Sequence, residues 1–182
     1  AFEAATDRDG HLTSITKSNA QAHSMVFWDD IVEEVSEEYP TVTLERLLVD
    51  AAAMDMIRRP QEFDVVVASN LFGDILTDIG AQITGSMGLA PSGNINPSDN
   101  IPSMFEPVHG SAPDIVGDGV ANPLATVLSW SMLLEDLGEK TAADALWYAV
   151  TNQLADGSAP RTPDLGGDAG TEAVVDDLQT RL

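Results

Sequence analysis

Apolar side chains recur along the chain with two different spacings, and these spacings predict its secondary structure. Residues 11–16 alternate between polar and apolar positions, as a strand does, and residues 41–49 resemble a second strand. The compact run Val65-Val66-Val67-Ala68 suits a strand that is buried on both faces of a parallel sheet. Apolar positions at helical spacing, together with helix-ending residues, predict helices over residues 1–5, 20–38, 51–59, 71–83, 123–137, 140–154 and 171–182.

Turn-forming residues mark the segments between these elements. Asp9-Gly10 predicts a turn, and Gly138 predicts the end of a helix that we expect to be buried through Trp130, Met132, Leu133 and Leu134. Residues 85–118 contain many Gly, Pro, Asn and Ser, so we interpret them as a long functional loop region, and residues 159–167 as a shorter loop. Strands that alternate with helices predict an α/β fold.

The net charge of the chain makes some classes of binding partner unfavourable. The 182 residues include 30 acidic side chains and only 8 Lys and Arg, for a formal net charge of −22. Nucleic acids and anionic membranes are therefore poor partners, because their phosphates must be neutralised by basic side chains. A hydrophobic fraction of 43% still indicates a folded domain. The acidic, lysine-poor composition favours a protein adapted to high salt, and an ordinary acidic cytosolic protein is the alternative.

Several classes of protein are excluded by what the composition lacks. The chain has no cysteine, which excludes disulfides, cysteine metal sites and cysteine nucleophiles. Its apolar runs are too short for a transmembrane helix, and residues 1–7 have neither the basic nor the apolar region of a secretory signal. We therefore expect a cytoplasmic protein.

Two carboxylates on one predicted helix form the first candidate site. Asp74 and Asp78 are four residues apart, so they lie on one face of the helix that follows the run Val65–Ala68. Ligands of open α/β sheets gather beyond the carboxyl ends of the strands. A pair of carboxylates there suits Mg²⁺ or Mn²⁺, and an exposed acidic helix face is the alternative.

Two further polar residues follow the predicted strands. Lys17 is one of only two lysines, and a partly desolvated lysine can relay protons, although a surface lysine at a strand end would look the same. Asp50 follows strand 41–49, where it is either a further carboxylate at the sheet edge or the N-cap of the next helix.

The segment 106–115 is the third candidate. Its sequence is Glu106-Pro107-Val108-His109-Gly110-Ser111-Ala112-Pro113-Asp114-Ile115. Small residues allow the backbone to approach a ligand closely, and an Asp can accept hydrogen bonds from a ribose diol. The alternative is a structural Gly/Pro loop with a satisfied histidine. No Gly-x-Gly-x-x-Gly dinucleotide fingerprint occurs in the chain.

These motifs together resemble a known family. Asn70-Leu71-Phe72-Gly73-Asp74-Ile75-Leu76-Thr77-Asp78, then segment 106–115 and Ala121-Asn122-Pro123, are similar to the β-decarboxylating hydroxyacid dehydrogenases. That family contains the isopropylmalate, isocitrate, homoisocitrate and tartrate/D-malate enzymes. Thr16-Lys17-Ser18-Asn19 and Met25-Val26-Phe27-Trp28-Asp29 most resemble the tartrate/D-malate branch, and 3-isopropylmalate dehydrogenase comes next.

The resemblance implies a fold and a division of the chain. The fold would be isopropylmalate dehydrogenase-like, a partly parallel sheet flanked by helices that is not a Rossmann fold. The chain would be the C-terminal half, with a dimerisation and substrate subdomain over about 10–65 and a cofactor-binding part over about 66–182. The family's substrate-binding arginine cluster and catalytic tyrosine would belong to the other half. We therefore expect the isolated chain to be inactive.

The resemblance also implies roles for particular residues. Lys17 would relay a proton in the neighbouring subunit's site, which implies a homodimer. Asp74 and Asp78 would bind Mg²⁺ or Mn²⁺, with Asp50 contributed across the dimer interface. Asn19 would lie near the nicotinamide. The adenosine half of the cofactor would be lined by His109, Gly110, Ser111, Ala112, Asp114, Ile115 and Asn122, with Glu106 near its ribose.

The implied reaction is the oxidative decarboxylation of a 2-hydroxy acid, with hydride transfer from C2 to NAD⁺ and loss of CO₂ from C3. NADP-using isocitrate relatives tend to carry Lys-Tyr where this chain has Asp114-Ile115, and an Asp would repel a 2′-phosphate, which favours NAD. The alternatives are a non-catalytic regulatory subunit of a hetero-oligomeric dehydrogenase, or an acidic interaction domain in which the motifs are accidental. The presence of Lys17, Asp50, Asp74 and Asp78 argues against the regulatory subunit, and the interaction domain would require every motif to be an accident.

The net charge of −22 predicts that the fold depends on salt. Ions screen repulsion between surface carboxylates, so the chain should unfold at a higher temperature in molar KCl than at low ionic strength. Thermal unfolding followed by circular dichroism at the two salt concentrations measures this. Equal resistance to unfolding in both would contradict adaptation to high salt.

Overall fold

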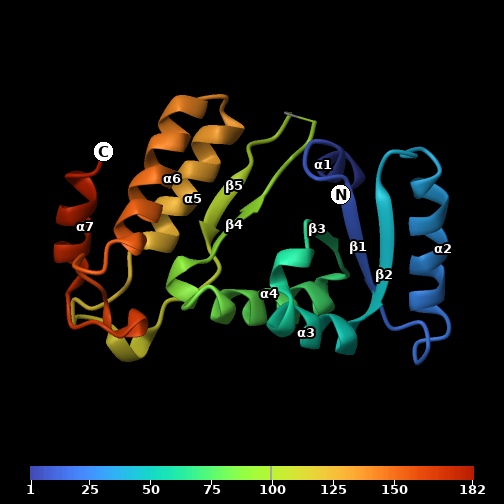
Figure 1. The fold of residues 1–182 in the computed structure, drawn as a ribbon, viewed down its shortest axis with the longest axis horizontal. Helices are drawn as coiled ribbons and strands as arrows, with labels where there is room; N and C mark the ends of the chain where they lie inside the picture. Colours follow the sequence, from blue (N-terminus) through green and yellow to red (C-terminus); the bar gives the residue numbers. More distant parts are fainter. Residues whose placement is uncertain (99) are drawn as a thin grey trace. The chain divides into compact units, whose positions relative to one another are not determined.

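The computed structural model describes residues 1–98 and 100–182, which form two compact units, Ala1–Ile83 and Thr84–Leu182 (Figure 1). Each unit has its own strands, helices and buried core. Within the described residues, no helix combines the length and the apolar character that crossing a membrane requires.

A three-stranded parallel sheet organises the first unit. Its strands are β1 (His11–Thr16), β2 (Thr43–Leu48) and β3 (Val65–Val67), in the order β2-β1-β3. The helices are α1 (Phe2–Thr6), α2 (Ser24–Ser36), α3 (Val49–Arg58) and α4 (Asn70–Ile83), with the 3₁₀ turn η1 (Pro60–Glu62) before β3. The alternation of strands and helices confirms the predicted α/β class.

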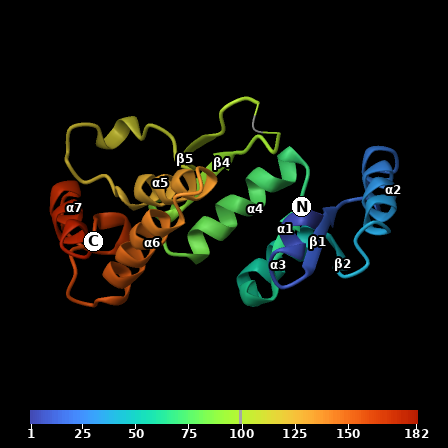
Figure 2. The same ribbon diagram turned by 90° about the horizontal axis from the view of Figure 1, so that it is seen from above.

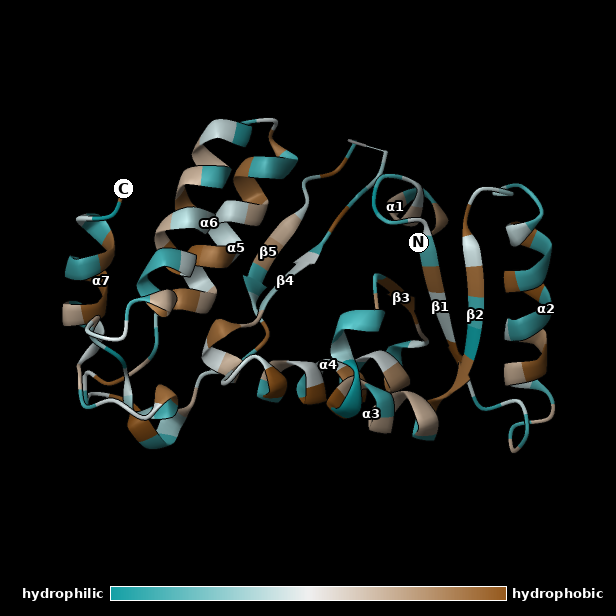
Figure 3. Cartoon of the chain, in the orientation of Figure 1, coloured by the Kyte–Doolittle hydropathy of each residue, from teal (hydrophilic) through white to brown (hydrophobic). Residues whose placement is uncertain are grey.

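Apolar side chains cover both faces of this sheet. One cluster joins Leu12 to α1 and α2, and the other joins Ile15 to α3 and α4. Leu12 and Ile15 are three positions apart on β1, so their side chains point to opposite faces. Along α2, polar and apolar bands alternate (Figure 3), as expected for a helix with one face on the sheet.

The prediction that residues 65–68 form a fully buried strand is wrong. β3 is an edge strand of this sheet and is only half-buried, whereas the central β1 is buried along nearly its whole length. Because β1 is buried, its hydroxyl side chains are buried along with its apolar ones. One of them, Ser14 Oγ, accepts a hydrogen bond of 3.0 Å from Trp28 Nε1.

The helix predicted from residue 20 begins later, at Ser24. The preceding residues form a turn, because the N–H groups of Ala20 and Gln21 both donate to the carbonyl of Lys17, at 2.9 and 2.8 Å. This turn fixes the chain directly after β1. The positions next to Lys17 therefore belong to a structured loop rather than to the helix.

The second unit combines a β-hairpin with three helices. Its elements are β4 (Pro91–Asn94), β5 (Met104–Pro107), α5 (Leu124–Asp136), α6 (Lys140–Ala155) and α7 (Thr171–Gln179), with 3₁₀ turns η2 (Met87–Leu89), η3 (Pro113–Ile115) and η4 (Pro163–Leu165). β4 and β5 pair antiparallel. The prediction that 85–118 is all loop is therefore wrong where the hairpin lies; residue 99 of that stretch is outside the described residues.

Helix α5 is the central element of the second unit. It packs against α6 and against both hairpin strands, and its buried Leu124 and Leu128 join a core with residues of α6 and α7. The predicted buried side chain Trp130 is in fact 59% exposed. Gly138 follows α5 with a φ of +80°, and its N–H donates to Glu135 O at 2.9 Å, which confirms its role at the helix end.

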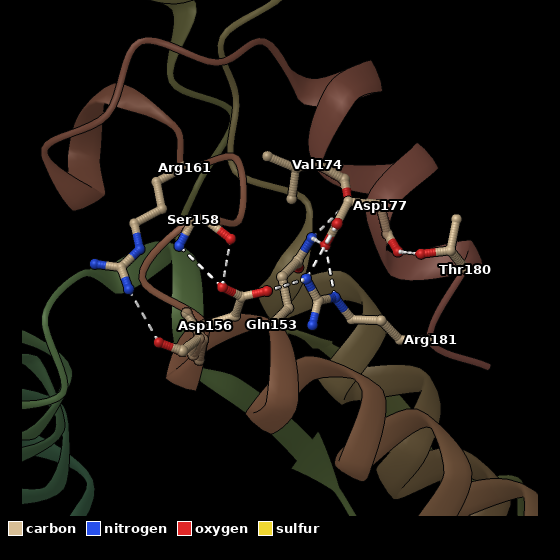
Figure 4. Close-up of polar contacts among 9 residues, drawn as sticks. Gln153, Asp156, Ser158, Arg161, Val174, Asp177, Thr180 and Arg181 are labelled. Carbon is tan, nitrogen blue, oxygen red and sulfur yellow. Dashed lines mark hydrogen bonds and ion pairs between the residues drawn. The ribbon is translucent and has the colours of Figure 1, made fainter.

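A polar cluster ties α7 to the end of α6 (Figure 4). Gln153, 2% exposed, donates to Val174 O and Asp177 Oδ2 at 2.9 and 2.8 Å. Arg181 donates to Asp177 Oδ2 at 2.7 Å and to Asp156 Oδ2 at 3.0 Å. The hydrogen bond from Arg181 is the main reason that the pKa of Asp177 lies below its ordinary value. The cluster closes the base of the loop between α6 and α7.

Gln153→Ala tests this cluster. The substitution removes two hydrogen-bond donors from a buried position and leaves a cavity, so it should lower the free energy of unfolding by about 2 kcal/mol. Urea unfolding followed by circular dichroism measures the change. Asn152→Ala, at the exposed neighbouring position of α6, is the matched control. Equal stability of the two variants would contradict a stabilising role for Gln153.

Candidate functional site

The parallel sheet of the first unit brings the two predicted strand-end residues together. In the register of β1 and β2, Thr16 pairs with Leu48, so the chain segments that follow both strands leave the same edge of the sheet. Lys17 follows β1, and Asp50 lies in the first turn of α3, which begins directly after β2 (Figure 1). Their side chains form an ion pair between Lys17 Nζ and Asp50 Oδ1.

The ion pair sets the charge state of Asp50. The hydrogen bond from Lys17 is the largest cause, and a backbone hydrogen bond the next, of a pKa below the ordinary value for Asp50. The N-cap of α3 is Leu48, so the alternative role of Asp50 as the N-cap is wrong. The side chain of Lys17 is 26% exposed and that of Asp50 is 61% exposed, so both groups remain accessible to a ligand or to another subunit.

The two acidic residues of α4 lie one helical turn apart, as predicted. Asp74 and Asp78 are both exposed, while Phe72 and Leu76 of the same helix are buried in the core. Among the described residues, no group of three or more acidic or histidine side chains could hold a metal ion. A single chain would supply only two carboxylates if Asp50 served the neighbouring subunit, so the metal ligands remain a prediction. Asn19 lies exposed in the turn after β1.

The second unit contains a pocket of about 820 Å³. Six of the residues predicted to bind the adenosine half of the cofactor line it: His109, Gly110, Ser111, Ala112, Ile115 and Asn122. Two others do not: Glu106 lies on β5 and Asp114 lies in η3. The structure thus gathers most of the predicted adenosine-binding residues around one cavity, within one unit.

Figure 2 shows the loop that connects β5 to α5 and contains the short turn η3. This loop supplies most of the residues that line the pocket. It is fixed at both ends, by a bond of 3.0 Å from Val108 N to Ala90 O and one of 2.8 Å from Thr171 N to Gly119 O. Ala112 adopts a left-handed conformation with a φ of +40°, which is unusual for a residue other than glycine. Such conformations cluster at ligand-binding sites, where the backbone must approach a ligand.

His109 is half-buried beside this loop. Its Nδ1 lies 3.0 Å from the carbonyl oxygen of Gly110, so the ring is oriented by its own neighbour. The alternative of a histidine satisfied within the loop is compatible with this contact. Since His109 also lines the pocket, the second ring nitrogen is the group available to a ligand.

Several residues of the pocket were missed by the sequence analysis, among them Ser86, Met87, Gly88 and Asp164. Asp164 Oδ2 accepts hydrogen bonds from Ser86 Oγ and, at 2.9 Å, from Asn122 Nδ2. Burial raises the pKa of Asp164, but the hydrogen bonds from Ser86 and Asn122 are among those that more than offset it, so the pKa lies below the ordinary value. Gly88 was the one sequence signal for this part of the pocket, because a glycine in a polar loop often marks a place where the backbone closely approaches a ligand or another segment.

Comparison with known proteins identifies the class. Residues 1–178 match the family described as isocitrate/isopropylmalate dehydrogenase, and the chain belongs to this family. This confirms the resemblance found in the sequence.

The similar curated proteins include the dehydrogenases of both predicted branches. The chain is 46% identical over its full length to the "Probable tartrate dehydrogenase/decarboxylase" of Bacillus subtilis (strain 168) and covers 51% of that protein. It is 47% identical over 97% of its length to the "D-malate dehydrogenase [decarboxylating]" of Escherichia coli (strain K12), and covers 50% of it. Identity with the 3-isopropylmalate dehydrogenase of Thermobifida fusca (strain YX) is 48% over the full chain, which covers 50% of that protein. The chain therefore spans about half the length of these relatives.

Solved structures share the fold. The isocitrate dehydrogenase of Methylococcus capsulatus matches with a TM-score of 0.91 and 38% identity, over 98% of this chain and 52% of that one. The beta-decarboxylating dehydrogenase of Thermococcus kodakarensis, in its apo form, matches with a TM-score of 0.85 and 39% identity, over 99% of this chain and 52% of that one. These matches confirm the predicted fold class.

The Lys17–Asp50 ion pair predicts how the carboxyl group of Asp50 titrates. Since a hydrogen bond from a cation favours the charged form of a carboxyl group, the pKa of Asp50 should lie below its ordinary value, and Lys17→Met should move the titration midpoint upward. The carboxyl carbon of Asp50, followed by NMR as the pH is lowered, measures both. Lys140→Met, which changes the other lysine, is the control. An Asp50 midpoint that does not move in Lys17→Met would show that the ion pair is absent in solution.

Proposed function

We propose that this chain carries the cofactor-binding and metal-binding half of an NAD-dependent dehydrogenase that oxidises a 2-hydroxy acid and releases CO₂. The observation that carries the proposal is the pocket of the second unit, which six residues predicted to contact adenosine line together. The names of the relatives, which include tartrate, D-malate and 3-isopropylmalate dehydrogenases, support a hydroxy acid of this type as the substrate. Such a substrate is in keeping with a cytoplasmic enzyme.

The charges at the pocket favour NAD over NADP. Among the described residues that line it, Asp164 is the acidic side chain and none is lysine or arginine. A 2′-phosphate would need basic partners, and Asp114, beside the lining residue Ile115, would repel it. The free ribose diol of NAD has no such requirement, and a carboxylate can accept its hydrogen bonds.

The acidic residues of the first unit fit a hard divalent ion. Asp74 and Asp78 would hold Mg²⁺ or Mn²⁺, with Asp50 from the neighbouring subunit, because exposed carboxylate oxygens are the ligands that these ions prefer. The bound ion would supply Lewis-acid stabilisation of negative charge on the substrate.

Lys17 is the residue proposed to move the proton. Its ammonium group is held by Asp50 and is partly shielded from solvent, which restricts the positions that Nζ can take. To act as a base, Nζ would first release a proton to water and then accept the proton of the C2 hydroxyl; bound NAD⁺ would supply the hydride acceptor. Asp50 would orient the lysine and balance its charge. The apolar pocket residues Met87, Ile115 and Val116 would exclude water from the adenine ring.

A homodimer is part of this proposal. Helices α3 and α4 pack against each other, and both expose large apolar side chains: Met54, Ile57, Leu71 and Ile75. Exposed apolar side chains on neighbouring helices support a protein–protein interface. Since Lys17 and Asp50 are already paired within one chain, both would enter the neighbouring subunit's site as a unit.

The proposal is tested with a chain completed by fusion behind the N-terminal half of the Bacillus subtilis relative. The fusion should reduce NAD with D-malate, tartrate or 3-isopropylmalate in the presence of Mn²⁺, whereas the isolated 182-residue chain should not. Asp78→Asn should raise the Mn²⁺ concentration for half-maximal rate at least tenfold, because it removes a charged oxygen ligand. Asp136→Asn, at an exposed acid of α5, is the control.

Four outcomes would contradict parts of this assignment. Turnover by the isolated chain would refute its inactivity. Turnover that is independent of Mn²⁺ would refute the metal site, and no turnover at all would favour the non-catalytic regulatory subunit. A preference for NADP over NAD would refute the cofactor assignment while leaving the dehydrogenase class intact.

A further inference from the structure

Asp164 joins the pocket from a part of the chain far from the predicted motif. It lies in η4, between α6 and α7, 42 residues after its partner Asn122. The loop that carries it is firmly held, because Ala169 N donates to Arg161 O at 2.9 Å and Arg161 Nη2 donates to Leu154 O at 3.0 Å. Asp164 is therefore presented to Asn122 by a fixed backbone.

The contacts of Asn122 determine which way its amide points. Its Oδ1 accepts a hydrogen bond of 3.0 Å from Leu124 N, and its Nδ2 donates one of 2.9 Å to Asp164 Oδ2. A backbone N–H can only donate and an ionised carboxylate can only accept, so the reversed amide would lose both bonds. The lowered pKa of Asp164 keeps this carboxylate ionised at neutral pH.

Close packing against Gly88 also restricts the same amide. A Cβ added to Gly88 would lie 2.8 Å from both Cβ and Nδ2 of Asn122 and 2.9 Å from Asp164 Oδ2. Ser86 Oγ donates to that carboxylate oxygen and accepts a bond of 2.9 Å from Gly88 N. Three separate chain segments thus converge on one side chain that lines the pocket.

We propose that Asp164 is a positioning residue that makes the pocket select 6-aminopurines over 6-oxopurines, by fixing the amide of Asn122. This inference rests on the proposed function, in which the pocket receives the adenosine half of a dinucleotide. Fixed as observed, Asn122 retains one hydrogen on Nδ2 and one lone pair on Oδ1 for a ligand. Adenine offers the complementary pair, an amino donor next to a ring-nitrogen acceptor, and an asparagine amide can bind the two together. Hypoxanthine reverses the pair on its Watson–Crick edge, with a carbonyl acceptor next to an N–H donor.

The test measures the affinities of AMP and IMP for the full 182-residue chain by isothermal titration calorimetry. AMP should bind about tenfold or more tightly than IMP, the discrimination typical of a bidentate amide–base contact. In Asp164→Asn the new amide can also donate to Asn122 Oδ1, so of the two bonds that fix the amide of Asn122 only the one from Leu124 N still favours the observed orientation. The ratio of the two affinities should then fall to within about threefold of unity. Asp168→Asn, an exposed acid of the same loop, should leave the ratio unchanged.

The affinity ratio separates positioning from a purely structural role. A structural role would weaken both nucleotides equally, so an unchanged ratio in Asp164→Asn would overturn the inference. Gly88→Ala supplies a second variant, because its Cβ must displace the same amide, and it too should lower the ratio; circular dichroism checks that each variant folds. Equal affinity of the unaltered chain for AMP and IMP would overturn the inference alone. The absence of binding for both nucleotides would overturn it together with the proposed cofactor site.

Discussion

The parallel pairing of β1 with β2 is the constraint on which the candidate chemistry of the first unit depends. Because Thr16 is paired with Leu48, the residues after both strands leave the same edge of the sheet, and Lys17 meets Asp50 there. A register shift of one residue would also turn the buried Leu12 and Ile15 to the wrong faces. The apolar core therefore fixes the position of the ion pair, although neither of the paired side chains belongs to the core.

In the second unit the corresponding constraint is polar. Asn122 uses one atom of its amide to hold the start of α5 and the other to bind Asp164, so the fold and the pocket share one side chain. This double use explains why the space beside it is filled by glycine at position 88. These bonds hold Asn122 at the position where we propose that the base is recognised, and much of the remaining pocket wall comes from a loop anchored at its two ends.

The sequence predicted those features that depend on neighbours along the chain. The spacing of apolar residues within strand 11–16 and helix 71–83 indicates which face of each is buried, so both elements could be predicted. The structure has them at His11–Thr16 and Asn70–Ile83. The hairpin was missed because Pro91 and Pro107 begin and end its strands, and proline argues against a strand. Asp164 was missed for a different reason, because its role depends on a partner 42 residues away and no local pattern encodes that pairing.

Most of the few basic side chains in this acidic chain form ion pairs. Within the part of the chain that the structure describes, six of the eight form ion pairs with acids: Arg8, Lys17, Arg46, Arg58, Arg59 and Arg181. Several of these ion pairs join separate elements. Arg8 binds one carboxylate oxygen of Asp64, and the other oxygen accepts a hydrogen bond of 3.1 Å from Asp9 N. Together the two contacts tie the turn before β1 to the start of β3. An exposed pair of this kind contributes little by itself, so its value lies in fixing which segments meet. Acidic side chains far outnumber the cations that could pair with them, so we expect solvent ions to carry most of the screening and salt to stabilise the chain without any new contact.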